Sequence, residues 1–280
     1  MDQISVSLNL CDIIGRLPKD VPAAINSLIQ AMPYEKADRL YVGSYYCDTY
    51  FLNTAPTVWE ALFAYAANTG KKVTLVLPPV FEKDFEKIHS RTLALIQAAP
   101  GVLDELTVND FGALCCFENN ASVRLNFGRL LQKDSRDIRY EDFFNDTHTH
   151  RVFSDYYKQF FAEHHICGLE LDCTHAAISI PAHCDALTVA VHTPYCCTSV
   201  GSICEFAAVH RTGPQKFLYA GPCRGECNSM LLECTYEKKY PYVRLGRSVQ
   251  FDNSNCKILS AQPYRTVYSP VKELLKGVLS

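Results

Sequence analysis

The chain has 280 residues, 48% hydrophobic and 20% charged, which is enough to bury a substantial core and excludes a disordered or low-complexity chain. A formal net charge of −3 gives no sign of a surface for nucleic acid or acidic membranes. No apolar run approaches the roughly 20 residues of a membrane helix, and residues 1–4 carry no basic, apolar leader, so we expect a cytoplasmic protein without a membrane span.

Strands and helices alternate along the first two thirds of the chain. In order, the pattern predicts a strand at 5–10, a helix at 20–32, a strand at 40–42, a helix at 57–70, a strand at 73–77, a helix at 85–99, and strands at 106–108, 122–127, 168–172, 177–180 and 186–191. Apolar strands alternating with helices are typical of a parallel sheet, and this number of units favours a closed barrel.

From about residue 229 the pattern changes to longer alternating β segments, around Tyr236 and Val243, before a short final helix. No linker rich in Gly, Ser or Pro interrupts the chain. We therefore predict an α/β fold in one domain over residues 1–280. Its core is a TIM-barrel-like (β/α) barrel over about 1–228, and its C-terminal extension, over about 229–280, is rich in β structure.

Polar residues gather where the predicted strands end, at Cys47, Asn109, Asp172 and His192. In a barrel these positions lie at the carboxyl-terminal mouth, where active sites are built. Glu170 and Asp172 lie on the same side of one strand, so inside a barrel they must be paired or bind something. We predict that Glu170, Asp172 and His192 are catalytic. The alternatives are a strand-end cap or a salt bridge for the carboxylates, and a core position for the histidine.

Arginines supply the candidate substrate contacts. Arg124 lies in an apolar strand, where its charge needs an acid or an anion as partner. A basic run follows, at Arg129, Lys133, Arg136 and Arg139. Because a guanidinium binds carboxylates in a bidentate manner, we assign Arg124, Arg129 and Arg136, with Asn109, to substrate binding. Ion pairs with the interleaved aspartates are the alternative for most of the run.

The chain contains 14 cysteines. In a reducing compartment these are buried small hydrophobes, metal ligands or a reactive nucleophile. The densest ligand-like pattern is Cys204-x18-Cys223-x3-Cys227, and four thiolates suit either zinc or an iron–sulfur cluster. Burial in the core without any metal is the alternative for many of the 14.

Four segments in one order resemble the collagenase-like peptidase family U thirty-two. They are V-N-D-F-G-A at 108–113, G-R-L-L-Q-K-D-S-R-D-I-R at 128–139, H-T-P-Y-C-C-T-S-V-G-S-I-C at 192–204 and G-P-C-R-G-E-C at 221–227. A fifth segment, Y-V-G-S-Y-Y-C at 41–47, resembles the UbiV-type branch of this family, which serves anaerobic ubiquinone biosynthesis.

The resemblance to that branch implies a [4Fe–4S] cluster held by four cysteines, one early and three late in the chain. Carried over to this sequence, the ligands are Cys47, Cys204, Cys223 and Cys227. A sister branch uses another pattern, in which Cys197 and Cys256 would replace Cys47 and Cys227. Cys204 and Cys223 are common to both schemes.

The resemblance further implies an iron–sulfur enzyme, or a subunit of one, in oxygen-independent hydroxylation of a small molecule or lipid precursor. Prephenate would donate the oxygen, and the partner would be a sister protein in a heterodimer. Hydroxylation of an RNA base is an alternative that we rank lower, because the net charge is −3 and the basic run is short. A peptidase and a zinc-stabilised, non-catalytic partner protein are further alternatives.

Overall fold

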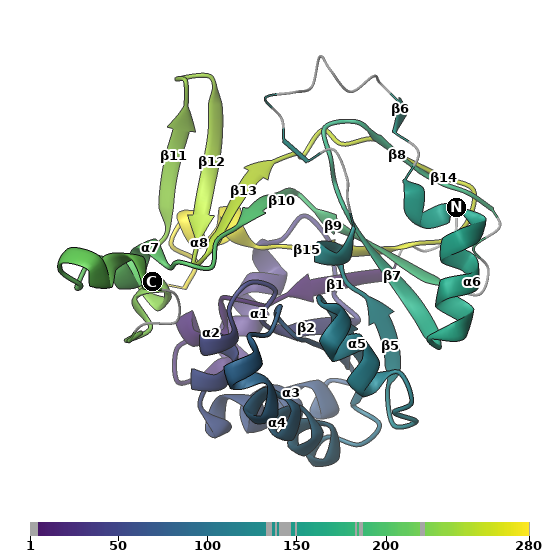
Figure 1. Cartoon of the computed structure of the whole chain (residues 1–280), viewed down its shortest axis with the longest axis horizontal. Helices are drawn as coiled ribbons and strands as arrows, with labels where there is room; N and C mark the ends of the chain where they lie inside the picture. The colour runs from purple at the N-terminus through teal and green to yellow at the C-terminus, as the bar shows by residue number, and fades with distance from the viewer. Residues whose placement is uncertain are drawn as a thin grey trace.

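Eight parallel strands close into a barrel in the computed structural model (Figure 1). The structure describes the chain except residues 1–4, 133–135, 138, 140–146, 149, 183, 185–186, 219–221 and 280. Around the barrel the strands are β1 (Ser5–Asn9), β15 (Arg265–Tyr268), β9 (Thr188–Thr193), β7 (Ile166–Asp172), β5 (Arg124–Phe127), β4 (Leu103–Val108), β3 (Lys72–Val76) and β2 (Arg39–Gly43). The chain therefore has the TIM-barrel-like α/β fold that the sequence predicts.

Helices cover the outer wall of the barrel along its first half. They are α1 (Val21–Ala31), α2 (Asp48–Asn53), α3 (Pro56–Asn68), α4 (Phe85–Ala98), α5 (Phe111–Phe117) and α6 (Asp155–Glu163). The start of α1 shows how the sequence sets these elements: Asp20 accepts a hydrogen bond from the Ala23 amide at 3.0 Å, and a proline stands in the first turn. Within the described part of the chain, no helix is both long and apolar enough to cross a bilayer.

Two smaller sheets extend the barrel. One is antiparallel, in the order β10 (Tyr195–Val200), β13 (Ser248–Asp252), β12 (Tyr240–Leu245) and β11 (Leu232–Tyr236). The other is parallel, in the order β14 (Ile258–Ser260), β8 (Ala177–Ile180) and β6 (Thr147–His148). Two short helices, α7 (Glu205–Ala208) and α8 (Val271–Leu275), complete this part. The predicted C-terminal region of β structure is confirmed.

The structure corrects the predicted barrel in two respects, the strands that form it and the residue at which it ends. The segment 177–180 forms β8 of the three-stranded sheet and not a barrel strand. The eighth barrel strand is β15, which lies between β1 and β9 and pairs with both, so the barrel does not end near residue 228. The chain passes from β9 into β10 with only Pro194 between them, and must return from the C-terminal region to close the barrel.

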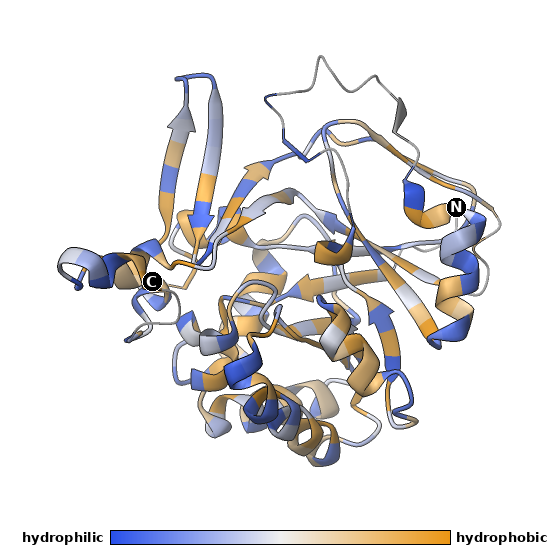
Figure 2. Ribbon diagram, in the orientation of Figure 1, coloured by the Kyte–Doolittle hydropathy of each residue, from blue (hydrophilic) through white to orange (hydrophobic). Residues whose placement is uncertain are grey.

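Hydrophobic residues of the barrel strands and of the helices pack into one buried core, and Figure 2 colours stretches of these strands and helices orange. The barrel interior is polar by comparison. Thr74, Glu105, Thr107, Asn126 and Glu170 are all buried and joined by hydrogen bonds across neighbouring strands. This polar interior continues up to the carboxyl-terminal mouth, beside the candidate site.

Candidate metal centre

Four cysteines from three separate segments line one cavity of about 250 Å³. Cys47 follows β2 and directly precedes α2, and Cys204 directly precedes α7. Cys223 and Cys227 belong to one loop that includes a short 3-10 helix, η7 (Glu226–Asn228). The structure thus brings together the four cysteines that the sequence predicts as ligands.

Backbone amides donate to two of the sulfurs. Cys47 is the N-cap of α2, and its Sγ accepts from the Tyr50 amide at 3.3 Å. The Sγ of Cys223 accepts from the Gly225 amide, also at 3.3 Å. Gly225 adopts a φ of +78°, which glycine takes without strain and which turns its amide back toward the sulfur. Such hydrogen bonds stabilise a thiolate and adjust the properties of any metal it binds.

Arg16 fastens the Cys223–Cys227 loop to the segment that follows β1. Its guanidinium donates to the backbone carbonyls of Cys227 and Met230. Next to it, the Gly15 amide donates to the Tyr50 hydroxyl at 2.6 Å, which ties the same segment to α2. A Cβ at Gly15 would lie 2.2 Å from Asn228 Oδ1, so a side chain at this position would have to displace the Asn228 side chain of the loop.

Burial and mutual proximity control the charge of these thiols. Burial raises the pKa of Cys47 to about 12, against the opposing effect of Arg247. Burial, followed by the charges of Cys204 and Cys223, raises the pKa of Cys227 to about 12. The thiols of Cys47 and Cys227 are therefore neutral on their own and need a positively charged centre to become thiolates.

Positive and unpaired polar groups also border the cavity. Arg247 is paired with the buried Asp48 at 2.9 Å, and Arg211 donates to the carbonyls of Leu218 and Pro222. The Nε atoms of both arginines, and Asn228 Oδ1, are buried without a hydrogen-bond partner among the described residues. The two arginine Nε–H groups are donors for an anionic group, the Asn228 oxygen is an acceptor, and the cysteines offer thiols to a metal.

The sulfurs border the cavity without meeting at one point. Among the residues that the structure describes, no three His, Cys, Asp or Glu side chains are grouped closely enough to hold a single metal ion. The reserve ligands lie elsewhere: Cys197 packs with Tyr41, Tyr45 and Tyr46 at the barrel mouth, and Cys256 lines a different cavity. The geometry thus favours the first set of predicted ligands over the second.

Inside the barrel mouth, Glu170 and His192 form a compact buried group with Tyr45. Glu170 Oε2 accepts from the Tyr45 hydroxyl at 2.8 Å and lies 3.1 Å from His192 Nε2. Glu170 Oε1 accepts from the Thr107 hydroxyl at 2.6 Å. Burial, with the nearby Arg129, lowers the pKa of His192, so the imidazole is neutral. Its Nδ1 has no hydrogen-bond partner among the described residues.

Asp172 is paired with the basic run, as its position required. It is fully buried, forms an ion pair with Arg129, and lies 2.8 Å from the Arg136 guanidinium. Arg129 is 1% exposed and lies over the Tyr45 ring at 5.2 Å. Lys133 of the same run lies outside the described residues. Glu170, Asp172 and His192 therefore share one buried mouth with Arg129, and all three are enclosed.

The two remaining predicted substrate contacts have other partners. Asn109 is buried at the end of β4, where it donates to the Leu77 carbonyl at 2.8 Å and accepts from the Leu130 amide at 3.2 Å. It therefore holds the segment that carries Arg129. Arg124 is the first residue of β5, and so lies at the opposite, amino-terminal end of the barrel. The structure does not bring Arg124 to the mouth.

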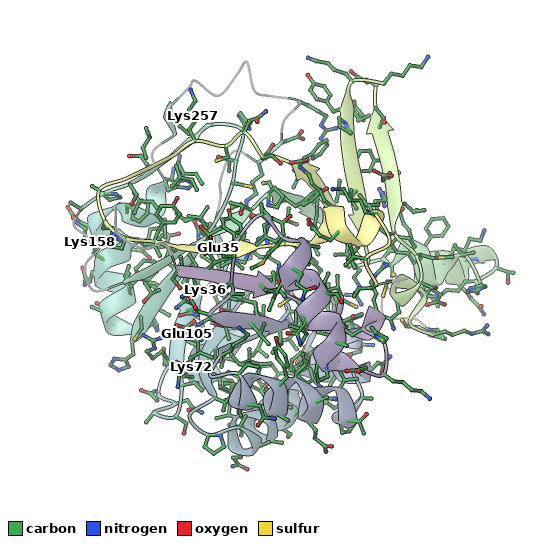
Figure 3. The ribbon with its side chains drawn as sticks, turned by 180° about the vertical axis from the view of Figure 1, so that it is seen from behind. Glu35, Lys36, Lys72, Glu105, Lys158 and Lys257 are labelled. Carbon is green, nitrogen blue, oxygen red and sulfur yellow. The ribbon has the colours of Figure 1, made fainter. Side chains whose placement is uncertain are left out.

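At that amino-terminal end, the buried Glu105, labelled in Figure 3, forms ion pairs with several arginines. It lies 2.6 Å from Arg124, 2.7 Å from Arg265 and 3.4 Å from Arg39. Burial alone would raise the pKa of Glu105, but the hydrogen bonds and charge of Arg265 lower it to about 2. The acidic partner predicted for Arg124 is thus Glu105. The two belong to a network of ion pairs at the amino-terminal end of the barrel, away from the candidate site.

Asp12 connects the cysteine cavity to the barrel mouth, and the sequence analysis missed it. It lines the cavity, accepts from the Ser44 hydroxyl, and accepts from the Tyr45 amide at 2.9 Å. Burial raises its pKa to about 6, and its φ of +63° places it in a strained region for a residue with a side chain. The sequence feature that could have identified Asp12 is its position, two residues after the end of the strand predicted at 5–10.

No protein-family model matches the chain, and no curated protein matches it.

Proposed function

We propose that this protein holds a [4Fe–4S] cluster through Cys47, Cys204, Cys223 and Cys227. The observation that carries the proposal is that these four cysteines, which come from distant parts of the sequence, line one cavity. Its volume of about 250 Å³ is several times the roughly 30 Å³ share of one water molecule, so it accommodates a centre of several atoms. In a cluster each thiolate binds a different iron, which suits sulfurs distributed around a cavity.

The surroundings of the cavity support the same proposal. Amide donors to Cys47 and Cys223 are the kind of contact that stabilises cluster sulfurs. Arg211 and Arg247 offset the negative charge that four thiolates bring to the site. A cluster with four cysteine ligands supplies one-electron transfer and leaves no open iron for a substrate. Bond-making chemistry would then fall to side chains nearby.

Those side chains lie in one group around Tyr45. Asp12 binds the Tyr45 amide, and the Tyr45 hydroxyl binds Glu170 and lies 3.2 Å from His192. In this group Glu170 Oε2 accepts the hydrogen bond of the Tyr45 hydroxyl, and the neutral His192 has an Nδ1 without a partner among the described residues that can accept a proton. These groups would hold and move protons, with Arg129 and Asp172 fixing the positions of the mouth.

The resemblance to the UbiV-type branch supplies the reaction class of the proposal. The protein would act in, or assist, oxygen-independent hydroxylation of a small molecule or lipid precursor, with prephenate as oxygen donor and a sister protein as partner. Prephenate is a dicarboxylate, and Arg211 and Arg247 at the cavity are suited to an anionic compound.

A series of cysteine variants tests the metal assignment. We expect Cys47→Ser, Cys204→Ser, Cys223→Ser and Cys227→Ser each to lose most of the iron and sulfide bound after reconstitution without oxygen. Cys115→Ser is the matched control, because that thiol is exposed on α5, and it should keep the wild-type content. Retention of iron by Cys204→Ser and Cys223→Ser would refute the assignment. Loss in Cys197→Ser and Cys256→Ser, with retention in Cys47→Ser, would replace it by the sister scheme.

A further inference from the structure

Exposed apolar side chains gather on one surface beside the cysteine cavity. Val209, Phe217 and Leu218 are 61%, 72% and 53% exposed. Val209 is the C-cap of α7, and Phe217 is the last residue of the 3-10 helix η6 (Gly213–Phe217), which packs against α7. In Figure 1 α7 lies at the edge of the molecule, on the side away from α6. Grouped apolar side chains on the outside of a protein are typical of a surface that contacts another molecule.

This surface, which we call the α7–η6 surface, adjoins the cysteine cavity. Leu218 lines the cavity although it is more than half exposed. The buried Arg211 donates to the carbonyls of Leu218 at 3.0 Å and Pro222 at 2.7 Å, which holds both residues beside the cavity. Cys204 and Cys223 are themselves only partly buried. A cluster bound by these cysteines would therefore lie close to the α7–η6 surface.

The charge of this surface is positive, although the whole chain has a net charge of −3. Residues 209–224 contain three Arg or Lys residues and no Asp or Glu. Lys216 and Arg224 are exposed, and no described acidic residue forms an ion pair with either of them. Of the nearest acids in the sequence, Glu205 is already in an ion pair and Glu226 is buried. An apolar centre with unbalanced positive charges is complementary to an acidic protein partner.

We propose that the α7–η6 surface is the docking site for an acidic electron-carrier protein of the ferredoxin type. The inference rests on the proposed function, because a [4Fe–4S] cluster with four cysteine ligands exchanges single electrons and needs a donor. The reduced [2Fe–2S] centre of the carrier gives up one electron and the cluster takes it up; no bond forms or breaks and no proton moves. A small contact steered by opposite charges is typical of such transient redox complexes.

Stopped-flow reduction of the reconstituted protein tests this docking site. The probe is an acidic plant-type [2Fe–2S] ferredoxin, reduced beforehand, and cluster reduction is followed by visible absorption. We expect Lys216→Glu and Phe217→Ser each to slow the reaction about tenfold at low salt, and the wild-type rate to fall as salt is added. A neutral deazaflavin radical is a small reductant that needs no docking surface, so it should reduce the wild type and both variants at the same rate.

The matched control is Lys158→Glu, which makes the same change of charge on α6. Figure 3 labels Lys158 on the side of the molecule away from α7. Isothermal titration calorimetry adds a readout that does not depend on electron transfer. Oxidised ferredoxin should bind the wild type and Lys158→Glu at one site per chain, and should bind Lys216→Glu and Phe217→Ser about tenfold more weakly.

Iron content and the visible spectrum separate a failure of this proposal from a failure of the proposed function. If the reconstituted wild type holds no cluster, the proposed function fails and the docking site fails with it. If the cluster is present, the docking site alone is refuted when the wild type does not bind ferredoxin, or when either surface variant binds ferredoxin and is reduced by it like the wild type. A wild-type dimer that Phe217→Ser abolishes, without any binding of ferredoxin, would assign the surface to a second copy of the chain and overturn the proposal.

Discussion

Arg16 is the residue whose replacement separates the stability of the fold from the organisation of the cysteine site. Its guanidinium donates to the carbonyls of Cys227 and Met230, and so fixes the loop that supplies two of the four thiols. In Arg16→Met the aliphatic packing is kept and both donors are lost. Hydrogen bonds from a charged group contribute about 1.5–3 kcal/mol each, and Arg16 is partly exposed, so we expect a total loss of about 3 kcal/mol.

Two measurements show whether that loss weakens the whole fold or only the loop. In metal-free protein, about 3 kcal/mol corresponds to a fall of about 6 °C in Tm for a chain of this size. If the loop is released instead of the whole fold weakened, the same energy is withdrawn from cluster binding. Iron retention in competition with a chelator should then weaken by about 100-fold.

Lys71→Met is the matched control, since Lys71 donates to the Ala37 carbonyl at 2.6 Å next to the amino-terminal end of β3. It should lower Tm without affecting iron retention. The reasoning would be refuted if Arg16→Met kept both the Tm and the iron retention of the wild type, or if Lys71→Met lost iron to the same extent as Arg16→Met.

Three further predictions concern buried charges. The pKa of Asp12 is raised by burial from 3.8 to about 6, so its contribution to stability is complete below pH 3.8 and is lost as the pH rises through about 6. In urea unfolding of metal-free protein, the free energy of unfolding of Asp12→Asn should therefore rise by about 3 kcal/mol relative to that of the wild type as the pH increases across this range. A difference in free energy between the two proteins that does not change with pH would contradict this prediction. The pKa of Glu105 is lowered from 4.5 to about 2, so its contribution is present above pH 4.5 and is lost as the pH falls through about 2. Glu105→Gln leaves Arg265 unpaired and should cost about 3–5 kcal/mol near neutral pH, a cost that shrinks toward pH 2; equal stability of variant and wild type at pH 7 would show that the network is dispensable. In reconstituted protein, Arg247→Gln should lower the reduction potential, because a positive charge near the cysteines favours the more negative reduced state. The control variant is Arg244→Gln, because Arg244 lies on β12 and is paired with Glu205. Equal reduction potentials in the two variants would count against the role of Arg247.

The sequence was informative where local pattern determines structure. Apolar strands and amphipathic helices each have a characteristic periodicity, and this periodicity was enough to predict the barrel fold. The alternation of Glu170 and Asp172 along one strand correctly indicated buried carboxylates that need partners. β15 was missed because its four residues follow a long β-rich segment, and only its pairing with β1 and β9 reveals its role. Arg124 was placed in the site because a strand pattern does not show which partner its charge will find.

The candidate site was predictable only in part for the same reason. Motif resemblance singled out four cysteines, but no spacing in one sequence shows that the loops carrying them meet. Asp12, Arg16, Tyr45 and Arg247 act through contacts between residues 33 to 214 positions apart, and no local pattern marks such contacts. The fold supplies these long-range contacts.

The most direct test of the central claim is the metal content of the wild-type protein, purified and reconstituted without oxygen, together with its visible absorption spectrum. The account predicts a brown protein with a broad band near about 400 nm, and about four irons and about four sulfides per chain. A colourless protein with about one zinc per chain would contradict the cluster and indicate a structural site of four thiolates. A protein that binds neither metal would show that the four cysteines around the cavity are not ligands.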